Sequence, residues 1–200
     1  MVALASPGAG PRLAQAVSER EGRTMEEYAI PAEARARMLA LLAMAWDGQW
    51  FLKVYDEYGW EAAARMNARV RAAFGRIEMR RMLRALGKES AADLEDAVHI
   101  VQVYFRDVLA AGFDAAFRND RDRAEITVTR CAAYLGSKRA GLERHDQACI
   151  ACRGLWHAYF EVLLPGTPVE VVLKEQMGHG AARCTIAIRA GRSDDSEGKQ

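Results

Sequence analysis

The sequence lacks a strong excess of charge of either sign. Its 28 basic and 27 acidic side chains give a formal net charge of +1 over 200 residues. Proteins that coat nucleic acid or other polyanions need a surface field of one sign. The near-cancellation makes nucleic acid an unfavoured partner, and we expect the arginines between Arg76 and Arg84 to form a solvated helix face.

The sequence also lacks a long hydrophobic run. The longest extends over the nine residues from Met38 to Trp46, whereas a bilayer-spanning helix needs roughly 20. No compact apolar segment follows a basic start near the N-terminus, so no secretory signal is predicted. These absences predict a cytoplasmic protein without a membrane partner. Half of the residues are hydrophobic, which is enough for a packed core and excludes disorder throughout the chain.

Composition separates a folded middle from two polar ends. Residues 1–27 mix Ala, Gly, Pro, Ser and Arg without a regular period, and residues 191–200 lack large apolar side chains. We predict a disordered leader and a disordered tail for these two segments. Between them we predict a helical subdomain over residues 28–118 and a cysteine-containing, metal-binding α+β subdomain over residues 119–190.

The front half has the periodicity of helices. Apolar residues recur at helical spacing from Pro31 until Gly59 interrupts the pattern, and a second stripe runs from Trp60 to Leu86. A third stripe begins near Leu94, after Ser90 and Asp93, which have the spacing of a capping box. The sequence therefore predicts three long helices before any strand.

The back half changes period. Residues 124–131 alternate between apolar and polar, as expected for a strand, and residues 149–164 return to helical spacing. Residues 169–175 and 183–189 alternate again and predict an antiparallel hairpin. This order of elements is typical of an α+β fold, with long N-terminal helices packed on a C-terminal helix and a small antiparallel sheet.

The four cysteines all lie in the back half. Without a secretory signal, a metal site or a redox role is favoured over structural disulfides. Strict alternation places Glu175 on the same face as Val171 and Leu173, which sends its carboxylate toward the interior. Cys184 lies on the interior face of the partner strand, and Cys152 lies on the apolar face of the helix.

A divalent cation would neutralise such a buried carboxylate and two thiols together. We therefore predict a zinc site on Cys152, Glu175 and Cys184, with His179, Cys149 or water as the fourth ligand. A fourth protein ligand would make the site structural, and a water would allow the metal to activate a nucleophile. The alternatives are cysteines that fill the core, a redox-active Cys149-x-x-Cys152 pair, and an iron–sulfur cluster on all four cysteines.

Two stretches of the front half carry a family resemblance: WDGQWF at residues 46–51 and RIEMRR at residues 76–81. They are similar to an uncharacterised prokaryotic family related to L-2-amino-thiazoline-4-carboxylate hydrolase. The back half resembles the 4-vinyl-reductase-type ligand-binding domain, whose aromatic-sensing members carry zinc on a helix cysteine, a strand glutamate and two further cysteines. Cys152, Glu175 and Cys184 match three of these positions, and His179 stands near the fourth.

The resemblance implies a pocket for a small organic ligand between the helical and strand halves. Seven residues are the candidates for its apolar wall and polar anchors: Trp46, Asp47, Trp50, Phe51, Glu78, Arg80 and Trp156. Aromatic residues at this spacing are also typical of a helix core. We expect a zinc-containing, small-molecule-binding sensor, with a metal-assisted hydrolase of a cyclic amide-like or thiazoline-like substrate as the alternative. A second copy of the chain is a candidate protein partner.

Overall fold

The structure is a computed structural model that describes residues 29–109, 112–120, 122–142, 144 and 149–191. Contacts divide the chain into residues 1–35 and residues 36–200, and the packing given below is that of the second unit. The predicted disordered leader, and the predicted tail beyond residue 191, lie outside the described residues. Among the described residues, no helix is both long and apolar enough to cross a bilayer.

The predicted α+β class is confirmed. The elements in chain order are α2 (Ala32–Ala85), α3 (Leu94–Asp107), β1 (Phe113–Asp120), β2 (Arg123–Cys131), α4 (Ala132–Arg139), α6 (Ile150–Leu163), β3 (Val169–Glu175), the short 3₁₀ helix η2 (Met177–His179) and β4 (Cys184–Ala190). The strands form one antiparallel sheet in the order β1-β2-β4-β3. Sequence reasoning missed β1 and α4, and the other elements lie where it placed them.

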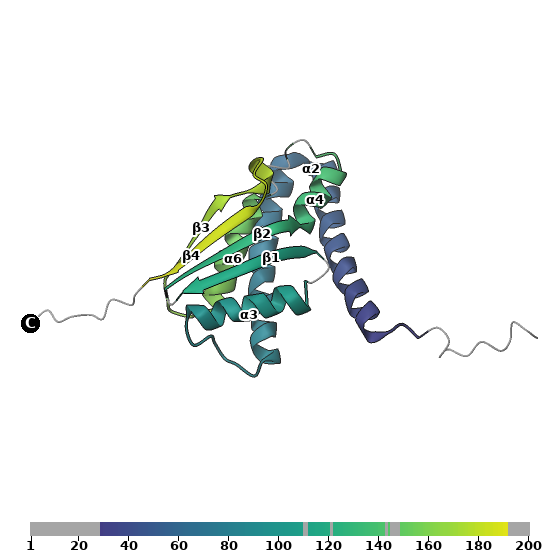
Figure 1. Cartoon of the computed structure of the whole chain (residues 1–200). Helices are drawn as coiled ribbons and strands as arrows, with labels where there is room; N and C mark the ends of the chain where they lie inside the picture. Colours follow the sequence, from purple (N-terminus) through teal and green to yellow (C-terminus); the bar gives the residue numbers. More distant parts are fainter. Residues whose placement is uncertain (1–28, 110–111, 121, 143, 145–148, 192–200) are drawn as a thin grey trace, which may run out of the picture. The chain divides into compact units, whose positions relative to one another are not determined.

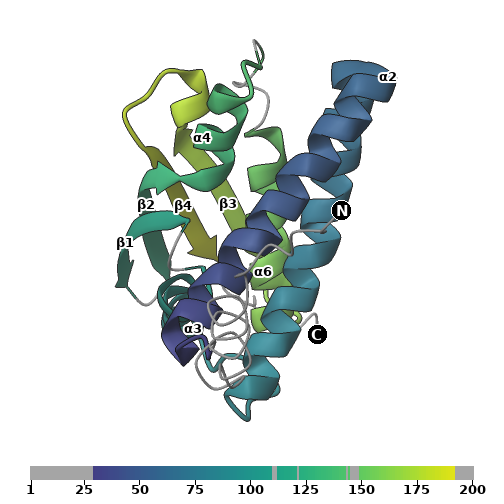
Figure 2. The same cartoon turned by 90° about the vertical axis from the view of Figure 1, so that its right-hand side faces the viewer.

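Element α2 is a hairpin of two helical arms, as Figure 2 shows. The break is Gly59, whose φ of 77° and ψ of −179° suit only glycine. In a straight helix Asp47 and Arg71 would be roughly 36 Å apart, but their charged groups are 4.0 Å apart. The ring of Phe51 also lies 5.8 Å from that of Trp60, so the chain reverses at Gly59, where the sequence predicted a break between two helices. We call residues 36–58 the first arm and residues 60–85 the second arm.

Helices α3 and α6 cover one face of the sheet (Figure 1). The core between them and the sheet contains large, fully buried side chains from both layers, including Tyr159, Phe160, Ile126, Ile186 and Ile188. The second arm of α2 packs on the outside of α6, where Gly75 leaves room for the side chains of Leu155 and Tyr159. The other face of the sheet carries polar and small residues, such as Thr127, Glu125 and Lys174.

Helix α3 begins one turn later than its predicted capping box. Its N-cap is Asp93, whose side chain accepts a hydrogen bond from the backbone N–H of Asp96 at 2.8 Å. Aspartate is among the preferred N-cap residues because its short side chain reaches the free N–H groups of the first turn. The carboxylate of Asp96 in turn accepts a hydrogen bond from the N–H of Ala92 at 2.9 Å and forms an ion pair of 2.6 Å with Lys88.

Candidate functional site

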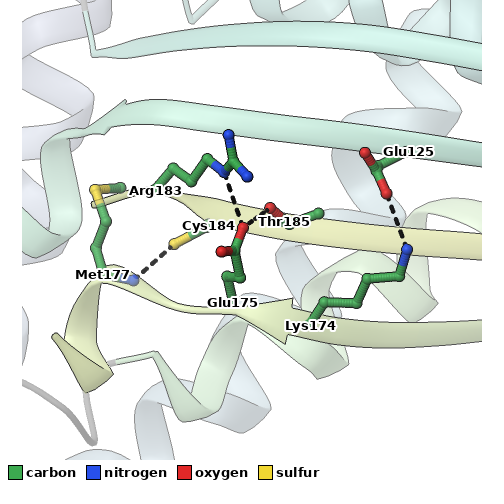
Figure 3. Close-up of polar contacts among 7 residues, drawn as sticks. All are labelled: Glu125, Lys174, Glu175, Met177, Arg183, Cys184 and Thr185. Atoms are coloured by element: carbon green, nitrogen blue, oxygen red, sulfur yellow. Dashed lines mark hydrogen bonds and ion pairs between the residues drawn. The ribbon is translucent and has the colours of Figure 1, made fainter. Parts of the chain in front are cut away.

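Glu175 does not point toward the interior. The register of β3 shifts between Leu173 and Glu175, so Leu173 pairs with Ile186 while Glu175 pairs with Thr185. Such a bulge places two consecutive side chains on the same side of the sheet. Lys174 and Glu175 therefore both lie on the polar face, where Lys174 forms an ion pair of 2.9 Å with Glu125 (Figure 3). The strict alternation assumed from the sequence fails at this one residue.

The carboxylate of Glu175 is held by two donors on that polar face. Thr185 Oγ1 donates to Glu175 Oε2 at 2.6 Å, and Arg183 Nε donates to the same oxygen at 2.8 Å. These hydrogen bonds, first that of Thr185 and then that of Arg183, lower the pKa of Glu175 below its usual value. Figure 3 shows the carboxylate turned to these partners and not to the thiol of Cys184.

Three of the four cysteines meet on the opposite, interior side. The thiols of Cys152 and Cys184 lie close enough to that of Cys149 to shift its pKa. The backbone N–H of Met177 donates to Cys184 Sγ at 3.3 Å. We call Cys149, Cys152 and Cys184 the thiol cluster. The carboxylate of Glu175, which was predicted to join Cys152 and Cys184, lies on the other face of the sheet.

The remaining predicted ligands do not complete a metal site. His179 is exposed, and its Nδ1 lies 3.5 Å from Gln176 Nε2. Cys131 is the N-cap of α4 without a side-chain capping hydrogen bond, and burial, with a smaller contribution from the thiols of Cys184 and Cys149, raises its pKa. In the part of the chain that the structure describes, no group of three or more His, Cys, Asp or Glu residues is arranged to hold a metal ion. Binding of zinc or of an iron–sulfur cluster therefore stays a prediction.

The predicted pocket residues are spread over three different environments. Trp156 is buried in the core, stacked on Phe105 at 5.7 Å, and Phe51 packs edge-on against Trp60. Trp46, Trp50 and Arg80 are exposed on the α2 hairpin. Two hollows, of about 290 and 440 Å³, lie along the strands, lined by residues such as Arg118, Glu170 and Arg189. Neither is the predicted pocket between helices and strands.

Asp47 and Glu78, the predicted polar anchors, do belong to one network. Glu78 is only 8% exposed. Tyr159 Oη donates to Glu78 Oε2 at 2.8 Å, and the ring of Tyr104 packs edge-on against that of Tyr159 with centroids 6.0 Å apart. Arg71 lies between the two carboxylates, with its guanidinium nitrogens 4.0 Å from Glu78 Oε1 and 4.0 Å from Asp47 Oδ2. We call these five residues the Glu78 network.

The electrostatics of the Glu78 network keep both tyrosines protonated. Burial, and then the negative charge of Glu78, raise the pKa of Tyr104 and of Tyr159 well above the usual value. Burial opposes the charge on Arg71, but the carboxylates of Glu78 and Asp47 outweigh it and raise the pKa of Arg71. Both tyrosines are thus neutral, and Tyr159 donates to the buried carboxylate. The network connects both arms of α2 to α3 and α6, and its chemistry is that of structural support.

Sequence reasoning missed Arg71, Tyr104 and Tyr159. Tyr104 and Tyr159 lie on the apolar stripes of α3 and α6, where an isolated hydroxyl gives no periodic signal. The sequence did contain a signal for this network, namely that the carboxylate of Glu78 lies on the buried stripe of the second arm, beside Met79 and Met82. A buried carboxylate needs donors, and hydroxyls on neighbouring apolar helices are the side chains that can supply them.

Comparison with known proteins shows a likeness of fold. No protein-family model matches the chain, and no curated protein matches it. Among solved structures, the chain is similar to a trafficking protein particle complex subunit 3 from Naegleria fowleri, solved covalently bound to palmitic acid. The TM-score is 0.54 at 17% sequence identity, over 80% of this chain and 96% of that chain. The hydrolase and vinyl-reductase resemblances stay predictions.

These findings correct the predicted function. The zinc-binding sensor and the metal-assisted hydrolase both depended on a metal held by Glu175 and the cysteines, and the described residues contain no such group. The similar fold is that of a subunit of a trafficking complex, not of a sensor or a hydrolase. The two functions, and the zinc and hydrolase descriptions that accompanied them, are therefore wrong.

Proposed function

We propose that this protein is a non-catalytic subunit of a protein assembly and that it associates through the α2 hairpin with a second copy of itself. The observation that carries the proposal is the apolar stripe, which we define as five side chains of the first arm: Met38, Leu39, Leu42, Trp46 and Trp50. Trp46 is 76% exposed, Leu39 is 59% exposed and Leu42 is 57% exposed. A tryptophan exposed to this degree beside two exposed leucines is typical of an interaction surface.

The stripe lies on the side of the first arm that faces away from the rest of the unit. The inward side is marked by Met44, which packs beside Gly112, by Asp47, which meets Arg71, and by Phe51, which packs on Trp60. At about 100° per residue, the stripe is centred on roughly the opposite side of the helix. The stripe is therefore available to a partner without any rearrangement of the fold.

The exposed apolar area matches what a dimer buries. The second arm adds four exposed side chains, Met66, Val70, Phe74 and Ile77. With the stripe, they expose roughly 700 Å² of apolar side-chain area, estimated from the usual area of each side chain. A standard interface buries about 800 Å² on each partner. Two hairpins related by a two-fold axis would cover each other's apolar side chains, which is the common arrangement in homo-oligomers.

The Glu78 network supports this surface from behind. Asp47 lies between Trp46 and Trp50 along the first arm, and its contact with Arg71 ties that arm to the second arm and to α6. A docking surface held in one position loses less conformational entropy on association than a mobile one does. The likeness to a subunit of a trafficking complex also supports a role through protein contacts.

Size-exclusion chromatography with light scattering tests the proposal. The wild-type chain is expected to have about twice its 22.1 kDa monomer mass at micromolar concentration. Trp46→Ser should raise the dissociation constant about 30-fold or more, because a central tryptophan contributes at least 2 kcal/mol to a typical interface. The Leu42→Ser variant should act in the same direction. Circular dichroism should show the same fold for each variant.

The matched control is Val172→Ser, which replaces an apolar side chain that is 42% exposed on the polar face of the sheet. This variant should remain dimeric. A wild-type chain that is monomeric up to about 100 μM would refute self-association. A dimer that is still dissociated at this concentration is weaker than is usual for an interface of the proposed size. A dimer whose dissociation constant is the same in Trp46→Ser and wild type would place the interface elsewhere and also refute the proposal.

A further inference from the structure

The thiol cluster has a geometry suited to dithiol–disulfide chemistry. Cys149 is the N-cap of α6, and Cys152 follows in the first turn, with its N–H bonded to the carbonyl of Cys149 at 3.0 Å. Residues three apart at this position share one side of the helix. Cys184 begins β4 and reaches the same place from the sheet. Cys149 thus has one thiol neighbour on its own helix and a second on a strand, and both are close enough to shift its pKa.

The three thiols differ in access to solvent. Cys149 is buried, whereas Cys152 and Cys184 are half-buried. The hydrogen bond with Cys152, followed by burial, keeps the pKa of Cys149 above its usual value despite the opposing contact with Cys184. The pKa of Cys184 is raised further, first by its hydrogen bond with Cys149 and then by burial. An oxidant therefore meets a half-buried thiol before it meets Cys149.

We propose that Cys149 is the shared sulfur of a reversible redox site, which forms a disulfide with Cys152 or, alternatively, with Cys184. The substrate class is a low-molecular-weight disulfide such as glutathione disulfide. Neither the fold likeness nor the proposed assembly role assigns this site, and it does not depend on them.

The chemistry proceeds by two exchanges. The thiolate of Cys152 attacks one sulfur of glutathione disulfide, whose S–S bond breaks and releases one glutathione thiolate. The thiolate of Cys149 then attacks the Cys152 sulfur of the mixed disulfide, and the second glutathione leaves. The two protons of the protein thiols end on the two released glutathiones. Two electrons pass from the protein to glutathione disulfide, and excess reduced glutathione reverses both steps.

Trypsin separates the cysteines conveniently for the test. Cleavage after Arg144 and Arg153 gives HDQACIACR, which contains both Cys149 and Cys152, and cleavage after Arg183 gives CTIAIR with Cys184. Cleavage after Arg130 and Lys138 gives CAAYLGSK with Cys131. The full chain is equilibrated with glutathione disulfide, its remaining thiols are alkylated, and the peptides are identified by mass without reduction.

The wild type should lose two of its four alkylatable thiols, within HDQACIACR or as a bridge from that peptide to CTIAIR. Cys152→Ser should give the bridged pair, and Cys184→Ser the internal disulfide. Cys149→Ser should form no disulfide within the chain, and the control Cys131→Ser should behave as wild type. A wild type that keeps all its thiols, or a Cys149→Ser variant that bridges Cys152 to Cys184, would overturn the proposal.

Discussion

Replacing Tyr159 by Phe removes one hydroxyl from the Glu78 network and changes little else. The ring of Tyr159 is fully buried, and it contacts the rings of Tyr104 and Trp156 edge-on at 6.0 and 5.6 Å. Phe preserves these ring contacts, because only the oxygen is lost. What disappears is the 2.8 Å hydrogen bond from Tyr159 Oη to the carboxylate of Glu78.

The expected loss of stability follows from the charge and burial of the acceptor. A hydrogen bond to a charged group contributes about 1.5–3 kcal/mol to the free energy of unfolding. Arg71 still lies 4.0 Å from Glu78 Oε1, so the carboxylate keeps a cationic partner, and the loss should stay below the about 3–5 kcal/mol typical of a buried ion pair that loses one partner. For a domain of this size, the melting temperature should fall by about 3–12 °C.

Urea denaturation followed by circular dichroism measures this free energy directly. The matched control is Tyr58→Phe, the same chemical change at a side chain that is 69% exposed, where a change of less than about 0.5 kcal/mol is expected. If the denaturation midpoints of Tyr159→Phe and Tyr58→Phe coincide, the hydroxyl does not stabilise the carboxylate and the account of the network is wrong.

Two further predictions concern packing and pH. Gly75→Ala should lower the free energy of unfolding by about 1–3 kcal/mol in urea denaturation, because its Cβ would lie 2.8 Å from Leu155 Cδ1. The control Gly154→Ala on α6 should be neutral or stabilising, because its Cβ would lie 3.7 Å from its nearest neighbour. Equal losses of stability at both sites would refute this helix contact. The hydrogen bonds from Lys88 and then from the N–H of Ala92 lower the pKa of Asp96, so its contribution to stability is complete above the usual aspartate pKa and is lost as pH falls through the lowered one. Asp96→Asn should therefore flatten the melting temperature between pH 5 and 2 relative to wild type, and parallel profiles would contradict this assignment.

Local sequence patterns predicted most of the helices and strands correctly. The break at Gly59, the helix from Ile150 and the β3–β4 hairpin all follow from hydrophobic periodicity and from residues that end an element. Strand β1 was missed because its inward positions include Ala115 and Asn119, which weaken the alternation. Its strand conformation depends on pairing with β2, a contact that does not show in its own residues.

Glu175 lies apart from the thiols because one residue of register decided its position. Alternation is a sound guide along a regular strand, but the shift after Leu173 turned Glu175 to the other face. Nothing in the residues 169–175 themselves signals that shift. Cys152 and Cys184 do pack against the core as expected, because the faces on which they lie are set by regular helical and strand periods.

The sequence by itself determined the α+β class, the break at Gly59 and the set of residues with reactive or ionisable side chains, since these depend on local periodicity and on single residues. Only the tertiary structure decided which side chains meet. It placed Glu78 against two tyrosines from distant helices, and it left Trp46 facing solvent. The physical reason is that burial, register and pairing depend on contacts between segments far apart in the chain, which no local pattern encodes.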